Sequence, residues 1–230
     1  MLDNKTLSVI IPVYNEINTI EKVLEKIDSL VLNDYHKQII VIDDFSNDGT
    51  REYLRSLKVG QPESIILFQK KNCGKGHSIK KGLQYVNGDY SVIVDADEEV
   101  DISVIIEWLS YNSSNVDAVI GIRQYESIDN YIYYLGRHIF SVLFRKLFHT
   151  DVQDPLVGLK LMKSSVIKSM ELRSKGFGID SEIIIKLIKG GYNFEQKPII
   201  YTPRKTDEGK KIRPYHAIKI LALWFKEAGK

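Results

Sequence analysis

Short runs of apolar residues alternate along this chain with stretches whose apolar residues recur every three or four positions. The runs predict buried strands and the periodic stretches predict helices. In the first half the predicted strands are 7–11, 39–42, 64–68, 90–94 and 117–122. The predicted helices between them are 17–31, 50–57 and 78–86, and Asn18 with Glu21 resembles a capping box at the first of these helices. This alternation favours a mostly parallel sheet covered by helices on both faces.

The pattern becomes less regular after residue 122. It predicts helices at 131–148, 180–189 and 218–225 and strands at 157–162 and 198–201. The segment 202–213 between the last strand and the last helix is polar and basic. Because no repeat, low-complexity segment or linker is recognisable, we expect one α/β domain over residues 1–230.

Composition excludes several classes of protein. The chain is 43% hydrophobic and 27% charged, which is typical of a globular protein, and its net charge of +2 argues against a nucleic-acid binder. The single cysteine, Cys73, excludes an internal disulfide and fits a reducing compartment. We expect no signal peptide and no spanning segment, so that any membrane contact would be peripheral.

Acidic residues follow the predicted strand 90–94. Asp95 and Asp97 flank Ala96, and two carboxylates at this spacing can turn to one side as the strand enters a loop. Mg²⁺ takes one or two such carboxylates together with substrate phosphates. A solvated acidic loop is the alternative interpretation. Glu99 adds local negative charge, which favours a bound cation.

Two more polar segments follow strands and are expected at the same edge of the sheet. Asp43 and Asp44 come after strand 39–42, and residues 12–16 follow the first strand. In open α/β sheets ligands bind at this edge, and an acidic side chain there can accept hydrogen bonds from a nucleoside. Taken singly, Asp43 and Asp48 are better explained as residues that shape a turn and cap the helix at Thr50.

Together these segments resemble family 2 glycosyltransferases. The matching stretches are 8–16 (SVIIPVYNE), 41–50 (VIDDFSNDGT), 72–76 (NCGKG) and 94–97 (VDAD). In the second half, 154–160 (DPLVGLK), 176–182 (GFGIDSE) and 201–211 (YTPRKTDEGKK) resemble the dolichyl-phosphate mannose synthase branch. The resemblance implies a single α/β domain with the GT-A fold, a donor half at 1–122, an acceptor half with a basic loop at 123–213, and an amphipathic helix at 214–230. It also implies inverting transfer of a hexose from a GDP- or UDP-sugar to a polyprenyl phosphate, at the cytoplasmic face of a membrane.

The resemblance carries roles to individual residues. It implies that the donor site comprises Pro12, Tyr14, Glu16, Asp43, Asp95, Ala96, Asp97, Arg123, Arg204 and Lys210. It implies that Mg²⁺ or Mn²⁺ is held by Asp95, Asp97 and Glu99, although the family usually has Gln where this chain has Glu99. Arg137 and Ser141, one helical turn apart, would meet the acceptor phosphate. The residues expected to act in catalysis are Asp97, Arg123, Arg137, Asp154 and Arg204.

The acceptor remains open at this point. A phosphate is already an anionic nucleophile and needs positive groups such as Arg123, Arg137 and Arg204 around it. A hydroxyl acceptor would need a carboxylate base, for which Asp154 is the candidate. A nucleotide- or metal-binding module without catalysis is the alternative that is not an enzyme.

Three further segments carry expectations. Residues 74–78 lack the glycine of a phosphate-binding P-loop, so we interpret them as a turn that opens a helix at Ser78. The basic loop 202–213 is expected to close over the donor. In the last helix, an apolar face of Ile218, Leu221, Ala222 and Phe225 bordered by Trp224 predicts a membrane-surface helix or, equally, a face packed on the core.

Overall fold

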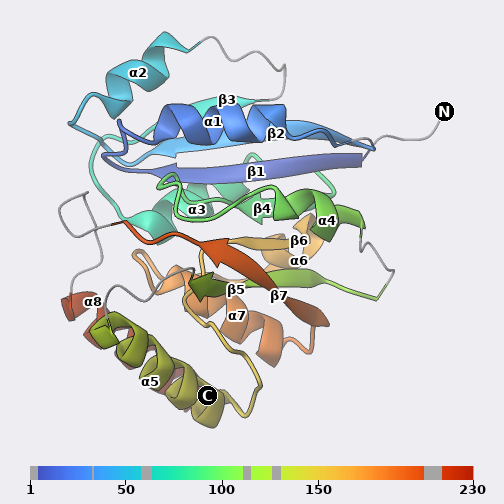
Figure 1. Ribbon diagram of the computed structural model, residues 1–230, viewed down its shortest axis with the longest axis vertical. Helices are drawn as coiled ribbons and strands as arrows, with labels where there is room; N and C mark the ends of the chain where they lie inside the picture. Colours follow the sequence, from blue (N-terminus) through green and yellow to red (C-terminus); the bar gives the residue numbers. More distant parts are fainter. Residues whose placement is uncertain are drawn as a thin grey trace.

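In the part of the chain that the structure describes, the protein forms a seven-stranded sheet with helices packed against it (Figure 1). The computed structural model describes residues 5–32, 34–57, 64–110, 115–125, 131–204 and 214–229. Across the sheet the strand order is β3-β2-β1-β4-β6-β5-β7. The strands are β1 (Lys5–Val13), β2 (Tyr35–Asp43), β3 (Ile65–Phe68), β4 (Tyr90–Ile93), β5 (Ala118–Tyr125), β6 (Lys160–Lys163) and β7 (Phe194–Tyr201). The predicted α/β class is confirmed.

One strand runs against the others. β6 pairs antiparallel with both β4 and β5, whereas the remaining pairs are parallel. The chain therefore enters β6 at the edge of the sheet where the parallel strands end. This reversal brings residues 154–159, which precede β6, to the edge where ligands bind in open α/β sheets.

Helices cover both faces of the sheet. The described helices are α1 (Ile20–Ser29), α2 (Thr50–Ser56), α3 (Lys75–Leu83), α4 (Val104–Ser110), α5 (Tyr131–Phe148), α6 (Ser164–Ser169), α7 (Ile179–Lys189) and α8 (Pro214–Ala228). Ile10 and its neighbours on β2 meet Gly82 of α3, where an added Cβ would lie 2.8 Å from the Ile42 side chain. Val9 and Ile11 face the other way and join the cluster that contains α1. Burial on both faces explains why this strand reads as a continuous apolar run.

Several element boundaries differ from the sequence-based expectations. The short helices α4 and α6 were not predicted, and α3 begins at Lys75 rather than at Ser78. β1 does not stop at Pro12 but continues to Val13. The pairing of β1 with β4 ends at Ile10, so Pro12 lies beyond the last residue paired with β4. The capping box is also wrong. The N-cap of α1 is Thr19, which makes no side-chain capping bond within the described chain.

The last helix packs on the protein itself. Trp224 of α8 is fully buried, and its ring lies 5.4 Å from that of Phe140 and 4.9 Å from that of Phe144, both on α5. Trp224 therefore packs on the protein, as the core alternative expects, and does not border an exposed face as the membrane alternative requires. Ile218 and Phe225 point outward, with 70% and 57% of their surface exposed. None of the helices in the described ranges is long and apolar enough to cross a bilayer.

Candidate active site

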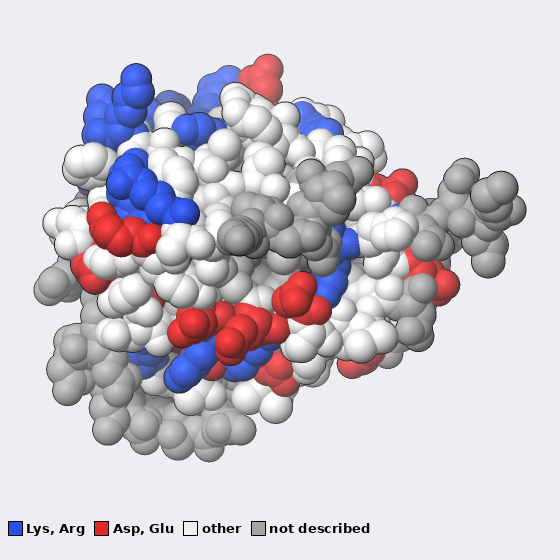
Figure 2. Space-filling model, turned by 90° about the horizontal axis from the view of Figure 1, so that it is seen from above, with Lys and Arg blue, Asp and Glu red and all other residues white. Residues whose placement is uncertain are grey.

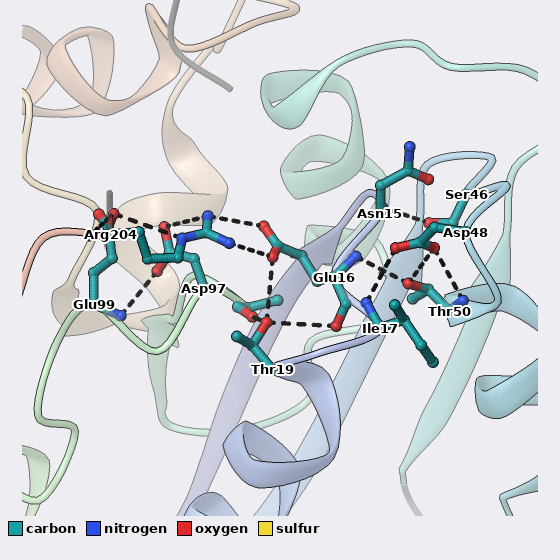
Figure 3. Close-up of polar contacts among 11 residues, drawn as sticks. Asn15, Glu16, Ile17, Thr19, Ser46, Asp48, Thr50, Asp97, Glu99 and Arg204 are labelled. Atoms are coloured by element: carbon teal, nitrogen blue, oxygen red, sulfur yellow. Dashed lines mark hydrogen bonds and ion pairs between the residues drawn. The ribbon is translucent and has the colours of Figure 1, made fainter. Parts of the chain in front are cut away.

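The loops that follow β1 and β2 are tied together at the carboxyl edge of the sheet. The Asn15 amide N–H donates to Ser46 Oγ at 2.9 Å, and the Glu16 N–H donates to Thr50 Oγ1 at 2.9 Å (Figure 3). Asp48 accepts from the N–H groups of Ile17 and Thr50 at 3.2 and 3.0 Å. Asn15 has a left-handed backbone with φ 51°. These bonds hold Glu16 at a defined place beside the acidic motif, and Asp48 shapes the turn as expected.

The two aspartates at the end of β2 lie beneath this loop rather than on its surface. Asp43 is fully buried and pairs with Arg51 at 3.2 Å, so the arrangement does not support its expected contact with a nucleoside. Asp44 accepts hydrogen bonds from the backbone N–H groups of Cys73 and Gly74, both at 2.7 Å. Burial raises the pKa of Asp44, although these N–H donors oppose the shift. Asp44 therefore fixes the turn from which α3 begins.

Each carboxylate of the acidic motif lies beside a basic side chain. The Lys75 Nζ is 2.7 Å from Asp95 Oδ1, and Arg204 Nη2 is 3.6 Å from Asp97 Oδ2. Burial and the neighbouring carboxylates of Asp95, Glu99 and Glu16 raise the pKa of Asp97 from 3.8 to about 7, against the opposing effect of Arg204. The motif thus holds more negative charge than its protein partners neutralise.

Arg204 links the β1 loop to the segment after β7. Its Nη1 and Nη2 donate to the two oxygens of Glu16 at 2.7 and 3.2 Å, and Figure 3 shows its guanidinium between Glu16 and Asp97. Glu99 accepts from the Tyr201 hydroxyl at 2.6 Å and from the Arg204 N–H at 3.0 Å. The Glu99 side chain is therefore engaged in placing the end of β7, which does not support its expected metal role.

The remaining donor set suits a divalent cation. Within the described ranges, no three His, Cys, Asp or Glu side chains are close enough together to hold a metal ion. Asp95 and Asp97 still provide two carboxylates, which is the usual protein share for Mg²⁺ when substrate phosphates supply further oxygens. Burial first, and then the neighbouring carboxylates, raise the pKa of Asp97, and a bound cation would favour its ionised form against both effects.

Three other residues were expected at the donor site. The Ala96 carbonyl accepts a hydrogen bond from Thr19 Oγ1 at 2.7 Å, and Pro12 and Tyr14 are half-buried at this edge. Lys210 lies outside the described residues, as does 205–213 of the basic loop.

On the acceptor side, two arginines meet one buried carboxylate. Arg123, on β5, donates to Asp154 through Nε and Nη2 at 2.7 and 2.8 Å, and Arg137 on α5 donates through Nη1 at 3.4 Å. Burial alone would raise the pKa of Asp154, but Arg123 and Arg137 hold it below its ordinary value. A buried carboxylate of lowered pKa is a poor proton acceptor, so Asp154 does not suit the base role. Ser141 donates to the Gln153 carbonyl at 2.6 Å and is buried.

Sequence reasoning missed the ionic centre behind the acidic motif. Lys75 bridges Asp95 and Asp180, and Lys160 pairs with the other oxygen of Asp180 at 3.0 Å. Burial lowers the pKa of Lys75, but Asp180 and Asp95 more than offset this and raise it above its ordinary value. Gly158 was also missed. Its lack of a side chain leaves room for Asp95, since an added Cβ would lie 1.9 Å from Asp95 Oδ2. The only available signal was that these residues fall in the stretches 72–76, 154–160 and 176–182.

On the face seen in Figure 2, basic and acidic side chains are mixed among uncharged ones. The described part of this face carries no continuous basic field of the kind that binds nucleic acid.

The open α/β sheet, with two aspartates and three arginines at its carboxyl edge, is the arrangement expected of the GT-A fold. The chain belongs to glycosyl transferase family 2, whose model matches residues 8–170. This match confirms the family that the resemblance implied.

Sequence relatives agree with the family, and solved structures agree with the fold. The chain is 30% identical over 215 residues to a dolichol-phosphate mannosyltransferase of Pyrococcus furiosus, with 89% of this chain and 58% of the relative covered. It is 25% identical over 167 to 169 residues to a prophage bactoprenol glucosyl transferase homolog of Escherichia coli and to the bactoprenol glucosyl transferase of Shigella phage SfV, with 72% of this chain and 55% and 54% of those relatives covered. The chain thus spans little more than half the length of these three relatives.

Glucosyl-3-phosphoglycerate synthase from Mycobacterium tuberculosis shares the fold. Its complex with UDP superposes with a TM-score of 0.73 at 19% identity, covering 98% of this chain and 80% of that one. Other structures of that enzyme contain UDP with Mg²⁺ or Mn²⁺.

Proposed function

We propose that this enzyme transfers a hexosyl group from a GDP- or UDP-sugar to a polyprenyl phosphate, with inversion at the anomeric carbon. One observation carries the choice of acceptor. Arg123 and Arg137 converge on Asp154, whose carboxylate is 0% exposed, while the arginine side chains keep 15% and 23% exposure. A site in which two guanidiniums surround a carboxylate that is a poor proton acceptor favours an acceptor that is already an anion. The names of the Pyrococcus and phage relatives point to the same class of acceptor.

In the proposed reaction a phosphate oxygen of the acceptor forms a bond to the anomeric carbon while the bond from that carbon to the nucleoside diphosphate breaks. A single displacement from the opposite face inverts the configuration. Negative charge grows on the departing diphosphate, and groups that carry positive charge lower the barrier. Arg204 supplies one such charge from the end of β7, and Arg123 and Arg137 bring the second anion close.

Asp95 and Asp97 would hold Mg²⁺ or Mn²⁺ together with the diphosphate. When bound, the cation supplies positive charge to the leaving group. Its arrival would also neutralise Asp97, which Arg204 only partly balances. We therefore propose that the Arg204 guanidinium exchanges Glu16 for the diphosphate as the donor binds.

A lipid acceptor requires the enzyme to work at a membrane surface, and we place this enzyme at the cytoplasmic face. The outward side of α8 offers the contact. Tyr215, Ile218 and Phe225 are 53%, 70% and 57% exposed, and Lys219 and Lys226 on the same helix are exposed. Aromatic and aliphatic side chains bordered by lysines suit a helix lying in the headgroup region of an anionic bilayer. Ile218 and Phe225 belong to the face predicted from the sequence, whereas the buried Trp224 does not border it.

A transfer assay tests the proposal directly. Radiolabelled GDP- and UDP-hexoses are offered with a polyprenyl phosphate in detergent, with phosphoglyceric acid, or with a free sugar. We expect label in the lipid only, loss of transfer in excess EDTA, and loss of most transfer in Asp97→Asn with the fold retained. Asp117→Asn is the matched control, since it removes a carboxylate paired with Lys163 at 2.9 Å at the amino edge of the sheet. Label in a hydroxyl acceptor, or full activity in EDTA, would contradict the proposal.

A further inference from the structure

Lys75 is held by two carboxylates that come from distant parts of the chain. Its Nζ lies 2.7 Å from Asp95 Oδ1 and 2.8 Å from Asp180 Oδ2, and its side chain is 11% exposed. Asp95 follows β4, whereas Asp180 lies in the first turn of α7. The ammonium group therefore connects the acidic motif to a helix on the acceptor half of the chain.

The position of Lys75 is unfavourable for its own helix. Lys75 is the first residue of α3, and the first turn of this helix contains no acidic residue. A cation at this end opposes the helix dipole, whereas the carboxylate of Asp180 at the start of α7 is favoured by it. Lys75 is thus placed for its neighbours and not for helix stability.

The surrounding backbone is closely packed. A Cβ added at Gly74 would lie 2.6 Å from the Lys175 carbonyl oxygen, and one at Gly76 would lie 2.5 Å from that of Ser174. The His77 N–H donates to the Lys175 carbonyl at 3.0 Å. The start of α3 is therefore fixed against the segment that leads into α7, so that the separation between Lys75 and Asp180 is set by backbone contacts.

Asp180 has a second partner that serves the fold. Its Oδ1 accepts from Lys160 Nζ at 3.0 Å, and Lys160 is 0% exposed and also donates to the Val157 carbonyl. One oxygen of Asp180 thus balances a fully buried lysine, and the other faces the acidic motif through Lys75.

We propose that Asp180 is a positioning residue of the donor site: it holds the Lys75 ammonium against Asp95 and thereby sets the orientation of this first carboxylate of the acidic motif. The inference rests on the proposed function, because the orientation matters for a cation and a nucleoside diphosphate. Asp180 acts through Lys75 and touches no substrate itself.

A double-mutant cycle on binding tests the proposal. The affinities of the wild-type protein, Asp180→Asn, Lys75→Met and the double variant for UDP and GDP in the presence of Mn²⁺ are measured by calorimetry. Loss of a residue that orients a metal ligand is expected to weaken nucleotide binding about tenfold or more. Both residues act on Asp95, so their effects on nucleotide affinity should not add. The affinity of the double variant should be at most about twofold below that of the single variant that binds nucleotide more weakly. Asp117→Asn is the control and should stay within about twofold of the wild type.

Folding is checked by thermal unfolding, because Asp180→Asn leaves Lys160 buried without a carboxylate. If this variant is unfolded, the same cycle is run in a Lys160→Met background, which removes that unpaired charge. Additive losses, or wild-type affinity in Asp180→Asn, would overturn the inference while leaving the proposed function intact. A wild-type protein that binds neither nucleotide with Mn²⁺ would overturn the proposed function and this inference with it.

Discussion

Trp224 and Phe225 are adjacent in α8, but replacing the first should lower the free energy of unfolding strongly and replacing the second should hardly change it. Trp224 is 0% exposed and packs edge-on against Phe140 and Phe144, whereas Phe225 is 57% exposed. Truncating a buried Trp to Ala costs about 3–5 kcal/mol of unfolding free energy. At about 2–4 °C per kcal/mol for a chain of this size, Trp224→Ala should lower Tm by about 10 °C. Phe225→Ala should change the unfolding free energy by at most about 0.5 kcal/mol.

The same two positions separate folding from membrane contact. Insertion of the exposed Phe225 ring into a bilayer would contribute about 1–2 kcal/mol. Phe225→Ser should therefore weaken binding to anionic liposomes about tenfold without altering Tm. Trp224→Phe keeps an apolar ring in the interior and should leave liposome binding unchanged. The assays are urea unfolding and co-sedimentation with vesicles of anionic or neutral lipid over a range of salt concentrations.

Either measurement can refute the reasoning. A loss below about 1 kcal/mol in Trp224→Ala would mean that α8 does not pack on α5 as described. Equal binding of the wild type to neutral and anionic vesicles, or undiminished binding of Phe225→Ser, would remove the membrane role of the outward face and strengthen the case for a soluble acceptor.

Three further outcomes are expected. Gly158→Ala should displace Asp95, because its Cβ would lie 1.9 Å from Oδ2, and calorimetry should show Mn²⁺ affinity falling about tenfold or more; unchanged affinity would contradict this. Asp154→Asn should lower the unfolding free energy by about 3–5 kcal/mol, since two buried arginine contacts lose their counter-charge; a stable variant that loses only turnover would instead indicate a base. The pKa of Asp97 is raised from 3.8 to about 7. Between these two pH values the folded protein binds one more proton at Asp97 than the unfolded chain does, so the free energy of unfolding of the metal-free protein should fall as pH rises from about 4 to about 7. Mn²⁺ affinity should rise about tenfold from pH 6 to pH 8, as the carboxylate that binds the ion forms, and a flat profile would show that Asp97 is already ionised.

Local pattern was enough to predict the class of fold and the edge of the sheet at which the candidate residues gather. Residues 9–13 of the first strand are apolar at consecutive positions because helices cover both faces of the strand, and that arrangement is typical of parallel sheets. Parallel strands end at a common edge, so the polar residues after β1, β2 and β4 were expected to lie together there. Glu16 and Asp97 do lie close together, since both form ion pairs with Arg204.

The tertiary structure decided what these side chains touch. Nothing in the local sequence states that β6 is antiparallel, and that reversal brings Asp154 and Gly158 to the edge. Apolar periodicity shows that α8 has one face to bury but does not say whether Trp224 lies on it, since the partner helix α5 is about 80 residues away in sequence. Lys75 read locally as part of a turn, because its partners Asp95 and Asp180 lie 20 and 105 positions further along the chain. Propensity and periodicity act over a few residues, whereas ion pairs between distant elements exist only after packing has brought those elements together.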